Sequence, residues 1–239
     1  MSDTQEPRDR RFIAAAALIG LILVAGLAVV ALRLVGGGDD APEAGGATTA
    51  NPTASPSKSA GSSSACGLPD GSQDIPTGAP DTKWYFFRKV AVPEAPDLGP
   101  GNEGTETAAA SCFAHNPSGA LFAAATLAGD IFPRDERTKA VLRERAVPGV
   151  DLDALLQEDL GTPGPVSQIV GFRFEDYTQD RTTITLAAQL TEGPNAGALG
   201  ATPMTLVWRD GDWYLQLQAS SESIVLNSLD GFAKWSGVS

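Results

Sequence analysis

MTLVWRDGDWYLQL, residues 204–217, consists of two runs of alternating apolar and polar residues separated by Asp210-Gly211. An Asp-Gly pair between two such runs is a favoured two-residue turn of a β-hairpin. The register set by this turn pairs Arg209 with Asp212, Trp208 with Trp213, Leu206 with Leu215, and Met204 with Leu217. Every apolar residue then faces another apolar residue, and a slip of one position would break all of these pairs. The stretch therefore predicts two antiparallel strands with a common apolar face.

Two stretches before this hairpin also alternate, at residues 170–175 and 183–190, and predict further antiparallel strands. Residues 83–92, KWYFFRKVAV, are aromatic and β-branched enough to predict one more strand, and a Pro- and Gly-rich acidic loop follows at 93–106. The residues expected to face the interior of the sheet are all apolar, namely Val170, Phe172, Phe174, Ile184, Leu186, Leu206 and Leu215.

The region between these strands has helical periodicity. Ser118 is expected to cap a first helix, whose many alanines would allow close approach to another surface. Pro133 is expected in the first turn of a second helix, and Asp151 is expected to cap a third helix that stops at Gly161. Three helices followed by an antiparallel meander predict an α+β fold, with the helices packed on a curved antiparallel sheet.

Residues 12–32, FIAAAALIGLILVAGLAVVAL, contain no charged residue. A helix of this length spans about 32 Å, enough for a hydrocarbon core of about 30 Å. A cleaved signal peptide is the alternative, but its apolar region is usually about 7–15 residues, and no convincing small-residue cleavage site follows here. Arg8, Arg10 and Arg11 precede the span and acidic residues follow it, which predicts a cytoplasmic N-terminus and an extracellular C-terminal domain in a single-pass protein of the cell membrane.

The next segment is predicted to be a disordered linker, because 25 of its 30 residues are Gly, Ala, Ser, Thr or Pro. The predicted organisation is a cytoplasmic tail (1–11), a transmembrane anchor in the lipid bilayer (12–35), the disordered linker (36–65) and an exported α+β domain (66–239). This last domain has 12 basic and 23 acidic residues, a net charge of −11 that disfavours direct contact with nucleic acid.

Both cysteines of the chain, Cys66 and Cys112, lie in the exported domain. Disulfides persist in oxidising compartments, so we expect these residues to form one, with two free buried thiols as the alternative. A bridge would attach the end of the linker to the domain.

Few residues have side chains that suggest catalysis or cation binding. His115, the one histidine, could act as a general base beside a carboxylate, but its polar surroundings before a helix favour a loop or capping role. Asp210 and Asp212 flank a turn glycine, which favours turn chemistry over a cation site. A solvated turn is likewise favoured for the carboxylates near another strand connection, Glu175, Asp176 and Asp180.

The aromatic run at 84–87, WYFF, could present one face to a partner, although a buried strand is favoured. The sequence contains no G-x-S-x-G nucleophile motif, no phosphate-binding loop and no dinucleotide fingerprint. It therefore predicts a protein that is not an enzyme, with no catalytic, cofactor-binding or metal-binding residues and no cofactor.

The order of elements over residues 118–218 and the W-R-D-G-D-W ending resemble the nuclear-transport-factor-2-like (cystatin-like) superfamily, which implies a strongly bent sheet. The extra N-terminal strand and the loop at 93–106 depart from the simplest form of that domain. An anchor, a flexible linker and such a domain outside the cell together resemble the assembly-factor subunits of type IV secretion and conjugation channels. FAHNPSGALFAAATLAG (113–129) and LDGFAKWSG (229–237) are similar to uncharacterised anchored proteins of mobile elements in high-GC Gram-positive bacteria.

These resemblances imply a non-catalytic assembly or scaffold subunit of a conjugative DNA-transfer machine. Its partners would be other envelope or secretion-channel proteins, and it would self-associate weakly if at all. The alternative is a small-ligand-binding or enzymatic cone-fold domain at the cell surface.

The predicted topology can be tested with Ser57→Cys, which places a thiol in the linker. A membrane-impermeant thiol reagent should label this variant on intact cells, because the arginines before residue 12 hold the N-terminus in the cytoplasm. Labelling that requires lysis would reverse the orientation. A mature chain that begins near residue 36 would identify a signal peptide instead of an anchor.

Overall fold

The computed structural model describes residues 63–88, 90–160, 164–218 and 223–237. The predicted cytoplasmic tail, transmembrane anchor and nearly all of the linker lie outside these residues. Within the described part of the chain, no helix is both long and apolar enough to cross a membrane.

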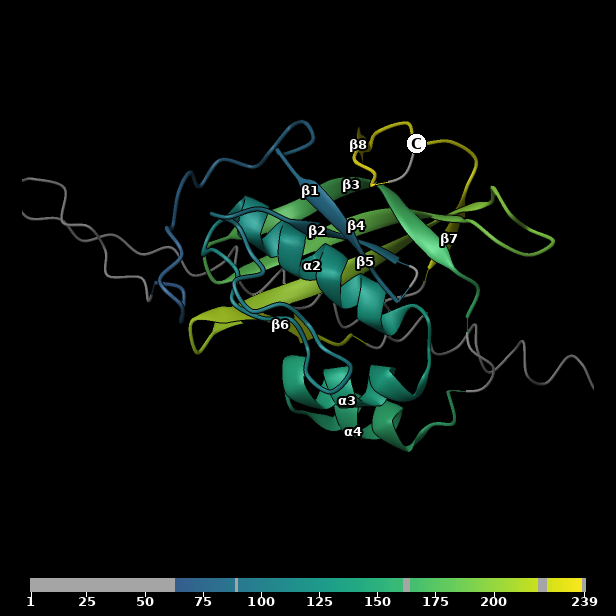
Figure 1. Ribbon diagram of the computed structural model, residues 1–239, viewed down its shortest axis with the longest axis horizontal. Helices are drawn as coiled ribbons and strands as arrows, with labels where there is room; N and C mark the ends of the chain where they lie inside the picture. The colour runs from purple at the N-terminus through teal and green to yellow at the C-terminus, as the bar shows by residue number, and fades with distance from the viewer. Residues whose placement is uncertain (1–62, 89, 161–163, 219–222, 238–239) are drawn as a thin grey trace, which may run out of the picture. The chain divides into compact units, whose positions relative to one another are not determined.

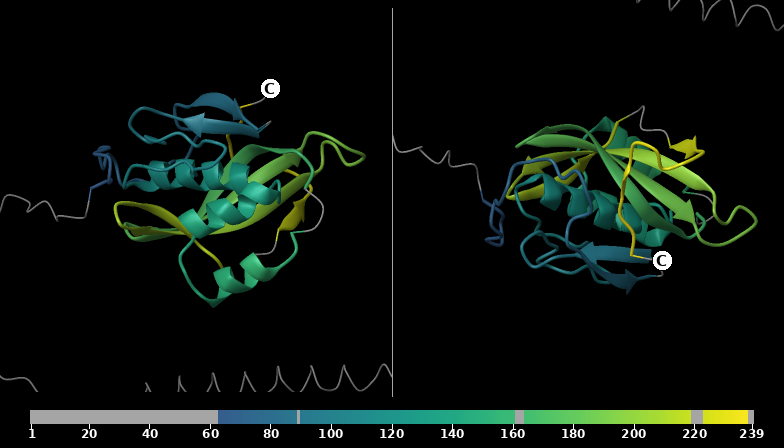
Figure 2. Two further views of the ribbon diagram at one scale, coloured as in Figure 1. Left: turned by 60° about the horizontal axis from the view of Figure 1, so that its bottom comes forward. Right: turned by 90° about the horizontal axis from the view of Figure 1, so that it is seen from above.

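Helix α2, Pro117–Ile131, is buried on nearly all sides, between a two-stranded sheet and a six-stranded sheet (Figures 1 and 2). A helix that is apolar all round belongs in an interior, and its alanines let both sheets approach closely. The helix begins two residues earlier than predicted, and Asn116 rather than Ser118 caps it. The Asn116 side chain accepts a hydrogen bond of 2.7 Å from the backbone N–H of Gly119, and Pro117 occupies the first turn.

Helices α3, Glu136–Arg145, and α4, Val150–Gln157, also differ from prediction at their starts. Asp135 caps α3 and forms a capping box with Thr138, so Pro133 lies in the turn before the helix. Helix α4 follows Gly149 without a side-chain cap, which places Asp151 in its first turn. Its predicted stop at Gly161 lies outside the described residues.

The six-stranded sheet is an antiparallel meander in the order β6-β5-β4-β3-β8, and β7 pairs with the first residues of β5. The strands are β3 (Ser167–Thr178), β4 (Arg181–Leu190), β5 (Leu199–Arg209), β6 (Asp212–Gln216), β7 (Ile224–Leu226) and β8 (Ala233–Lys234). The predicted α+β layout, with helices packed on an antiparallel sheet, is confirmed.

The predicted register of the β5–β6 hairpin is confirmed for three of its four pairs: Arg209 with Asp212, Trp208 with Trp213, and Leu206 with Leu215. The ladder ends at the pair Thr205–Gln216, so the fourth predicted pair, Met204–Leu217, does not form.

Most of the residues expected to face inward lie in the core or pack against it, but Val170 does not. A β-bulge between Ile169 and Gly171 adds one residue to β3 and shifts the alternation. As a result, Ile169 takes the place in the core that the pattern assigned to Val170.

Residues 83–92 form a hairpin and not one strand. Strand β1, Lys83–Phe87, pairs with β2, Val90–Glu94, and the chain reverses at Arg88, whose φ is 49°. The usual turn residues Gly, Asn and Asp are absent here, so the sequence carried no sign of this reversal.

Trp235 ties the C-terminal segment to three other elements. Its ring centroid lies 4.9 Å from that of Trp84 in β1, 5.4 Å from that of Phe122 in α2 and 5.8 Å from that of Phe172 in β3. Its indole Nε1–H donates to Thr82 Oγ1 at 2.9 Å. The segment that contains β8 and Trp235 therefore closes the β3 edge of the sheet and holds the small sheet in place.

Two glycines of α2 give a matched test of its packing. Gly129→Ala should raise the free energy of unfolding by about 0.5–1 kcal/mol, because alanine favours the helix. The new Cβ would lie at van der Waals distance, 3.5 Å from Val90 Cγ1 and 3.6 Å from Val92 Cγ2. Gly119→Ala should lower the free energy of unfolding by about 1–3 kcal/mol, since the new Cβ would overlap the Ala114 carbonyl. Urea denaturation measures both, and an equal loss in both variants would contradict this packing.

Candidate functional site

Asp212, the first residue of β6, has a carboxylate that is almost fully buried. Oδ2 accepts from the backbone N–H of Cys112 at 2.7 Å, and Oδ1 accepts from those of Phe113 at 3.0 Å and Trp213 at 2.9 Å. Arg145 Nη2, at the end of α3, lies 2.8 Å from Oδ2 and also donates to the Trp213 carbonyl. The predicted turn role is therefore wrong for Asp212, which links β6, α3 and the segment before α2.

Asp210 fits the turn role that was predicted for it. Its φ of 52° is the left-handed conformation of the hairpin turn, and its side chain is 71% exposed. The two carboxylates around Gly211 thus have different roles.

A disulfide joins Cys66 to Cys112, the pairing expected from the sequence, with 6.0 Å between the two Cα atoms. The residues just before Cys66 also contact the domain. Ala65 N–H donates to the carbonyl of Gly211 at 2.8 Å, and Ser64 is buried. Ala65 is thereby held at the turn of the β5–β6 hairpin.

The ring of His115 is buried against Trp208, with 4.0 Å between ring centroids and an angle of 9° between the planes. Its Nε2–H donates to the carbonyl of Gln179 at 2.7 Å. The residue was expected in a loop, and it does lie just before α2, but its ring is part of the interior. Its contacts link the start of α2 to the β3–β4 turn and to β5.

The carboxylates at the β3–β4 connection bind separate partners. Glu175 Oε1 accepts from Thr185 Oγ1 at 2.6 Å and from Arg173 Nε at 2.9 Å. Burial raises the pKa of Glu175, but these hydrogen bonds and the charge of Arg173 outweigh it, so the pKa falls below its usual value. Asp176 Oδ1 accepts from the Thr183 N–H at 2.9 Å. Among the described residues, no group of three or more His, Cys, Asp or Glu could hold a metal ion.

A second buried ion pair, which the sequence analysis missed, joins Asp130 at the end of α2 to Arg137 in α3. Arg137 Nε lies 2.7 Å from Asp130 Oδ1, and its guanidinium also donates to the carbonyls of Thr105 and Ala108. Burial raises the pKa of Asp130, against the lowering effect of Arg137. The pair fastens the loop after β2 to the helices.

The aromatic run at 84–87 is half-buried, and Phe86 is 67% exposed. Strand β1 therefore remains in contact with solvent, and the expectation of a buried strand is only partly met.

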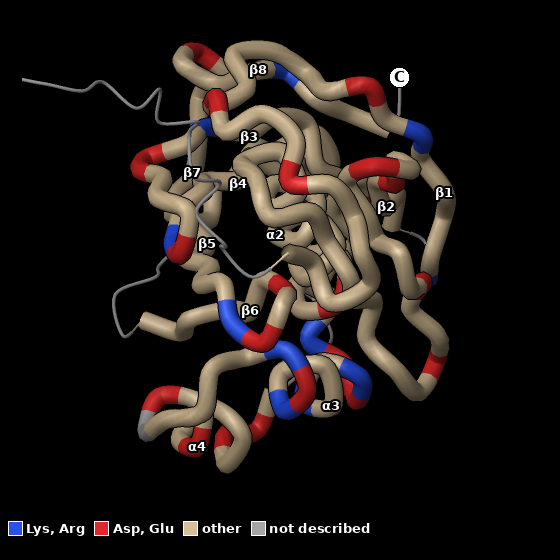
Figure 3. Tube along the Cα trace, turned by 90° about the vertical axis from the view of Figure 1, so that its left-hand side faces the viewer, with Lys and Arg blue, Asp and Glu red and all other residues tan. Residues whose placement is uncertain are grey.

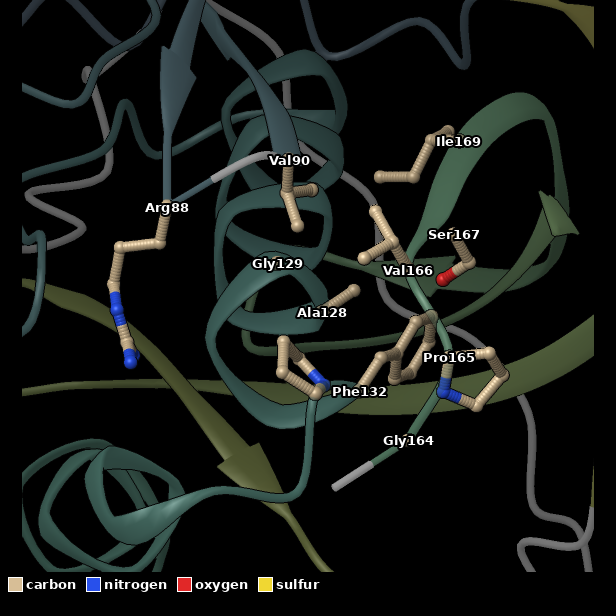
Figure 4. Close-up of a pocket in the computed structure, with 11 residues that line it drawn as sticks. Arg88, Val90, Ala128, Gly129, Phe132, Gly164, Pro165, Val166, Ser167 and Ile169 are labelled. Carbon is tan, nitrogen blue, oxygen red and sulfur yellow. The ribbon is translucent and has the colours of Figure 1, made fainter. Parts of the chain in front are cut away.

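Two hollows of the described domain border α2. The first is a cavity of about 50 Å³ beside the C-terminal half of α2, with Val90, Val166 and Ile169 among the side chains around it (Figure 4). Small-ligand sites are usually about 300–1,000 Å³, so this cavity is too small for one.

The second hollow is an open groove of about 740 Å³ at the end of the large sheet where β5 begins. Apolar side chains from α2, α3, α4, β4, β5 and β7 line it, including Ile131, Leu142, Leu155, Leu190, Leu199 and Ile224. Among its described lining residues, Arg134 is the one with a charge. The other charged residues gather mostly at turns and on α3 and α4 (Figure 3). The groove combines residues from six elements, and no sequence motif marks it.

The role of Asp212 can be tested by Asp212→Ala. The variant leaves Arg145 charged and buried and three backbone N–H groups without their acceptor, so the free energy of unfolding should fall by about 3–5 kcal/mol. Asparagine also tolerates the turn conformation, so Asp210→Asn should change the free energy of unfolding by less than about 0.5 kcal/mol. Chemical denaturation of the oxidised proteins measures both values. Similar losses in the two variants would show that Asp212 acts only through the turn.

A family model described as a domain of unknown function (DUF8175) matches residues 47–234. No curated protein and no solved structure matches the chain. The family match covers most of the chain and nearly all of the described domain. The chain therefore belongs to the DUF8175 family.

Proposed function

We propose that this protein is a membrane-anchored, non-catalytic assembly subunit of a conjugative DNA-transfer machine of the type IV secretion kind. In this proposal the N-terminus is cytoplasmic, residues 12–35 cross the cell membrane, and a nuclear-transport-factor-2-like domain lies outside the cell. Its partners are other envelope or secretion-channel proteins.

One observation carries the proposal: the side chains best suited to acid–base chemistry are engaged in holding the fold. Asp212 is enclosed by three backbone N–H groups and Arg145, and Asp130 is paired with Arg137. The His115 ring is stacked in the interior and bonded to a carbonyl. A general base must reach a proton of its substrate, and these groups already have internal partners.

The attachment of the domain also supports a role in association. The disulfide and the Ala65–Gly211 hydrogen bond fix the linker at the turn of the β5–β6 hairpin, whereas the apolar groove lies at the opposite end of β5. A partner at the groove would therefore not collide with the tether. Tethering also raises the local concentration of domains on one membrane, so weak contacts suffice.

The groove favours a second candidate function, a small-ligand-binding domain at the cell surface. Its volume of about 740 Å³ and apolar lining are typical of ligand sites. This candidate needs no catalytic residue.

A transfer assay tests the first proposal. DNA transfer from donor cells that lack the gene should fall to background and should be restored by the wild type and by His115→Phe. Phenylalanine keeps a flat ring against Trp208 but has no titratable nitrogen. Normal transfer by the deletion strain would rule out the conjugation role. Loss of transfer with stable, folded His115→Phe protein would give His115 a chemical role and overturn the non-catalytic assignment.

A further inference from the structure

We propose that the groove at the start of β5 binds a free long-chain fatty acid, with its carboxylate on Arg134 and its hydrocarbon chain along the apolar lining. The inference rests on the second candidate function and names its ligand.

The lining of the groove suits a hydrocarbon chain. Ile131 and Phe132 come from the end of α2 and the residue after it, Leu155 from α4, and Leu190 and Leu199 from the facing ends of β4 and β5. Transfer of methylene groups from water onto such a surface is favourable in proportion to the apolar area that is covered.

The rim of the groove leaves apolar side chains in water. Ile224 is 56% exposed and Val225 is 86% exposed, and both lie on the short strand β7 beside the groove. Neighbouring exposed apolar residues next to an apolar hollow are typical of a surface that is covered in use. A chain in the groove would bring Ile224 and Val225 into contact with hydrocarbon.

The charge of the groove selects the head group. The exported domain has a net charge of −11, yet the described lining residues include no acidic side chain and a single cation, Arg134. Arg134 is exposed, and its Nε–H donates to the carbonyl of Leu160 at 3.3 Å. Within the described residues it forms no ion pair, so its guanidinium can bind a carboxylate through two parallel hydrogen bonds.

The geometry disfavours an extended peptide as the occupant. A peptide would have to pair with β7, the edge strand beside the groove, and β7 has only three residues. Very short edge strands are poor templates for strand addition. A single-chain amphiphile needs no backbone partner.

The test uses the full chain in lipid nanodiscs and a photoactivatable diazirine analogue of palmitic acid. Mass spectrometry of the cross-linked peptides should place the label on α4, on the start of β5 and on β7. Excess palmitate should displace it, and a long-chain alkyltrimethylammonium ion should not. Arg134→Gln should reduce labelling of the groove about tenfold, the equivalent of one lost charge-assisted interaction. Arg143→Gln, an exposed arginine of α3 outside the groove, should leave it unchanged.

Other outcomes overturn the inference in distinguishable ways. Equal labelling by a neutral long-chain alcohol analogue, with no effect of Arg134→Gln, would keep the ligand site and reject the anionic head group. Displacement by added phospholipid as strong as by palmitate would assign the groove to membrane lipid. An absence of label from the groove peptides with every probe would remove the second candidate function itself. Thermal melting of both arginine variants, expected to match the wild type, excludes misfolding as the cause.

Discussion

The arrangement of the described domain depends on the ion pair and hydrogen bonds of the buried Asp212 carboxylate. A charge in an interior is costly unless opposite charge and hydrogen bonds compensate it, and Asp212 receives both, from Arg145 and from three backbone N–H groups. Two of those N–H groups belong to Cys112 and Phe113, just before the cap of α2. The same contact therefore sets the position of the disulfide, the start of the central helix and the end of α3 relative to β6.

With its start fixed in this way, α2 can serve as a core element for two sheets at once. Its alanines bring both sheets close, and Gly129 lies directly beneath Val90 and Val92 of β2. The small sheet has little support of its own, because two strands are marginal in isolation. Trp235 provides that support by packing against Trp84 from β1 while it also contacts α2 and β3. The C-terminal segment and the helix together hold the hairpin on the domain.

Features that depend on neighbouring residues could be predicted from the sequence, and features that depend on distant ones could not. The Asp210-Gly211 turn encodes the register of its hairpin locally, so the pairs from Arg209 to Leu206 were predictable. The partners Arg145 and Asp212 lie in different elements with no shared periodicity, so only the fold shows that they meet. The reversal at Arg88 carries no turn residue, and the bulge after Ile169 is marked only by the single glycine Gly171; both altered the predicted strands. The groove was equally hidden, because six elements each contribute only one or two ordinary apolar residues.

The domain places ionisable side chains in its interior and apolar ones on part of its surface. Buried pairs such as Asp212–Arg145 and Asp130–Arg137 occupy groups that could otherwise act on a substrate, while Ile224 and Val225 remain in water beside the groove. The disulfide and the Ala65–Gly211 hydrogen bond lie at one end of β5 and the groove at the other. In our proposals both candidate functions would use this second end, since a partner protein and a fatty acid would each cover the same apolar rim. They would therefore compete for one surface, and only a ligand with an anionic group would pair with Arg134, the one charged residue among the described residues that line the groove.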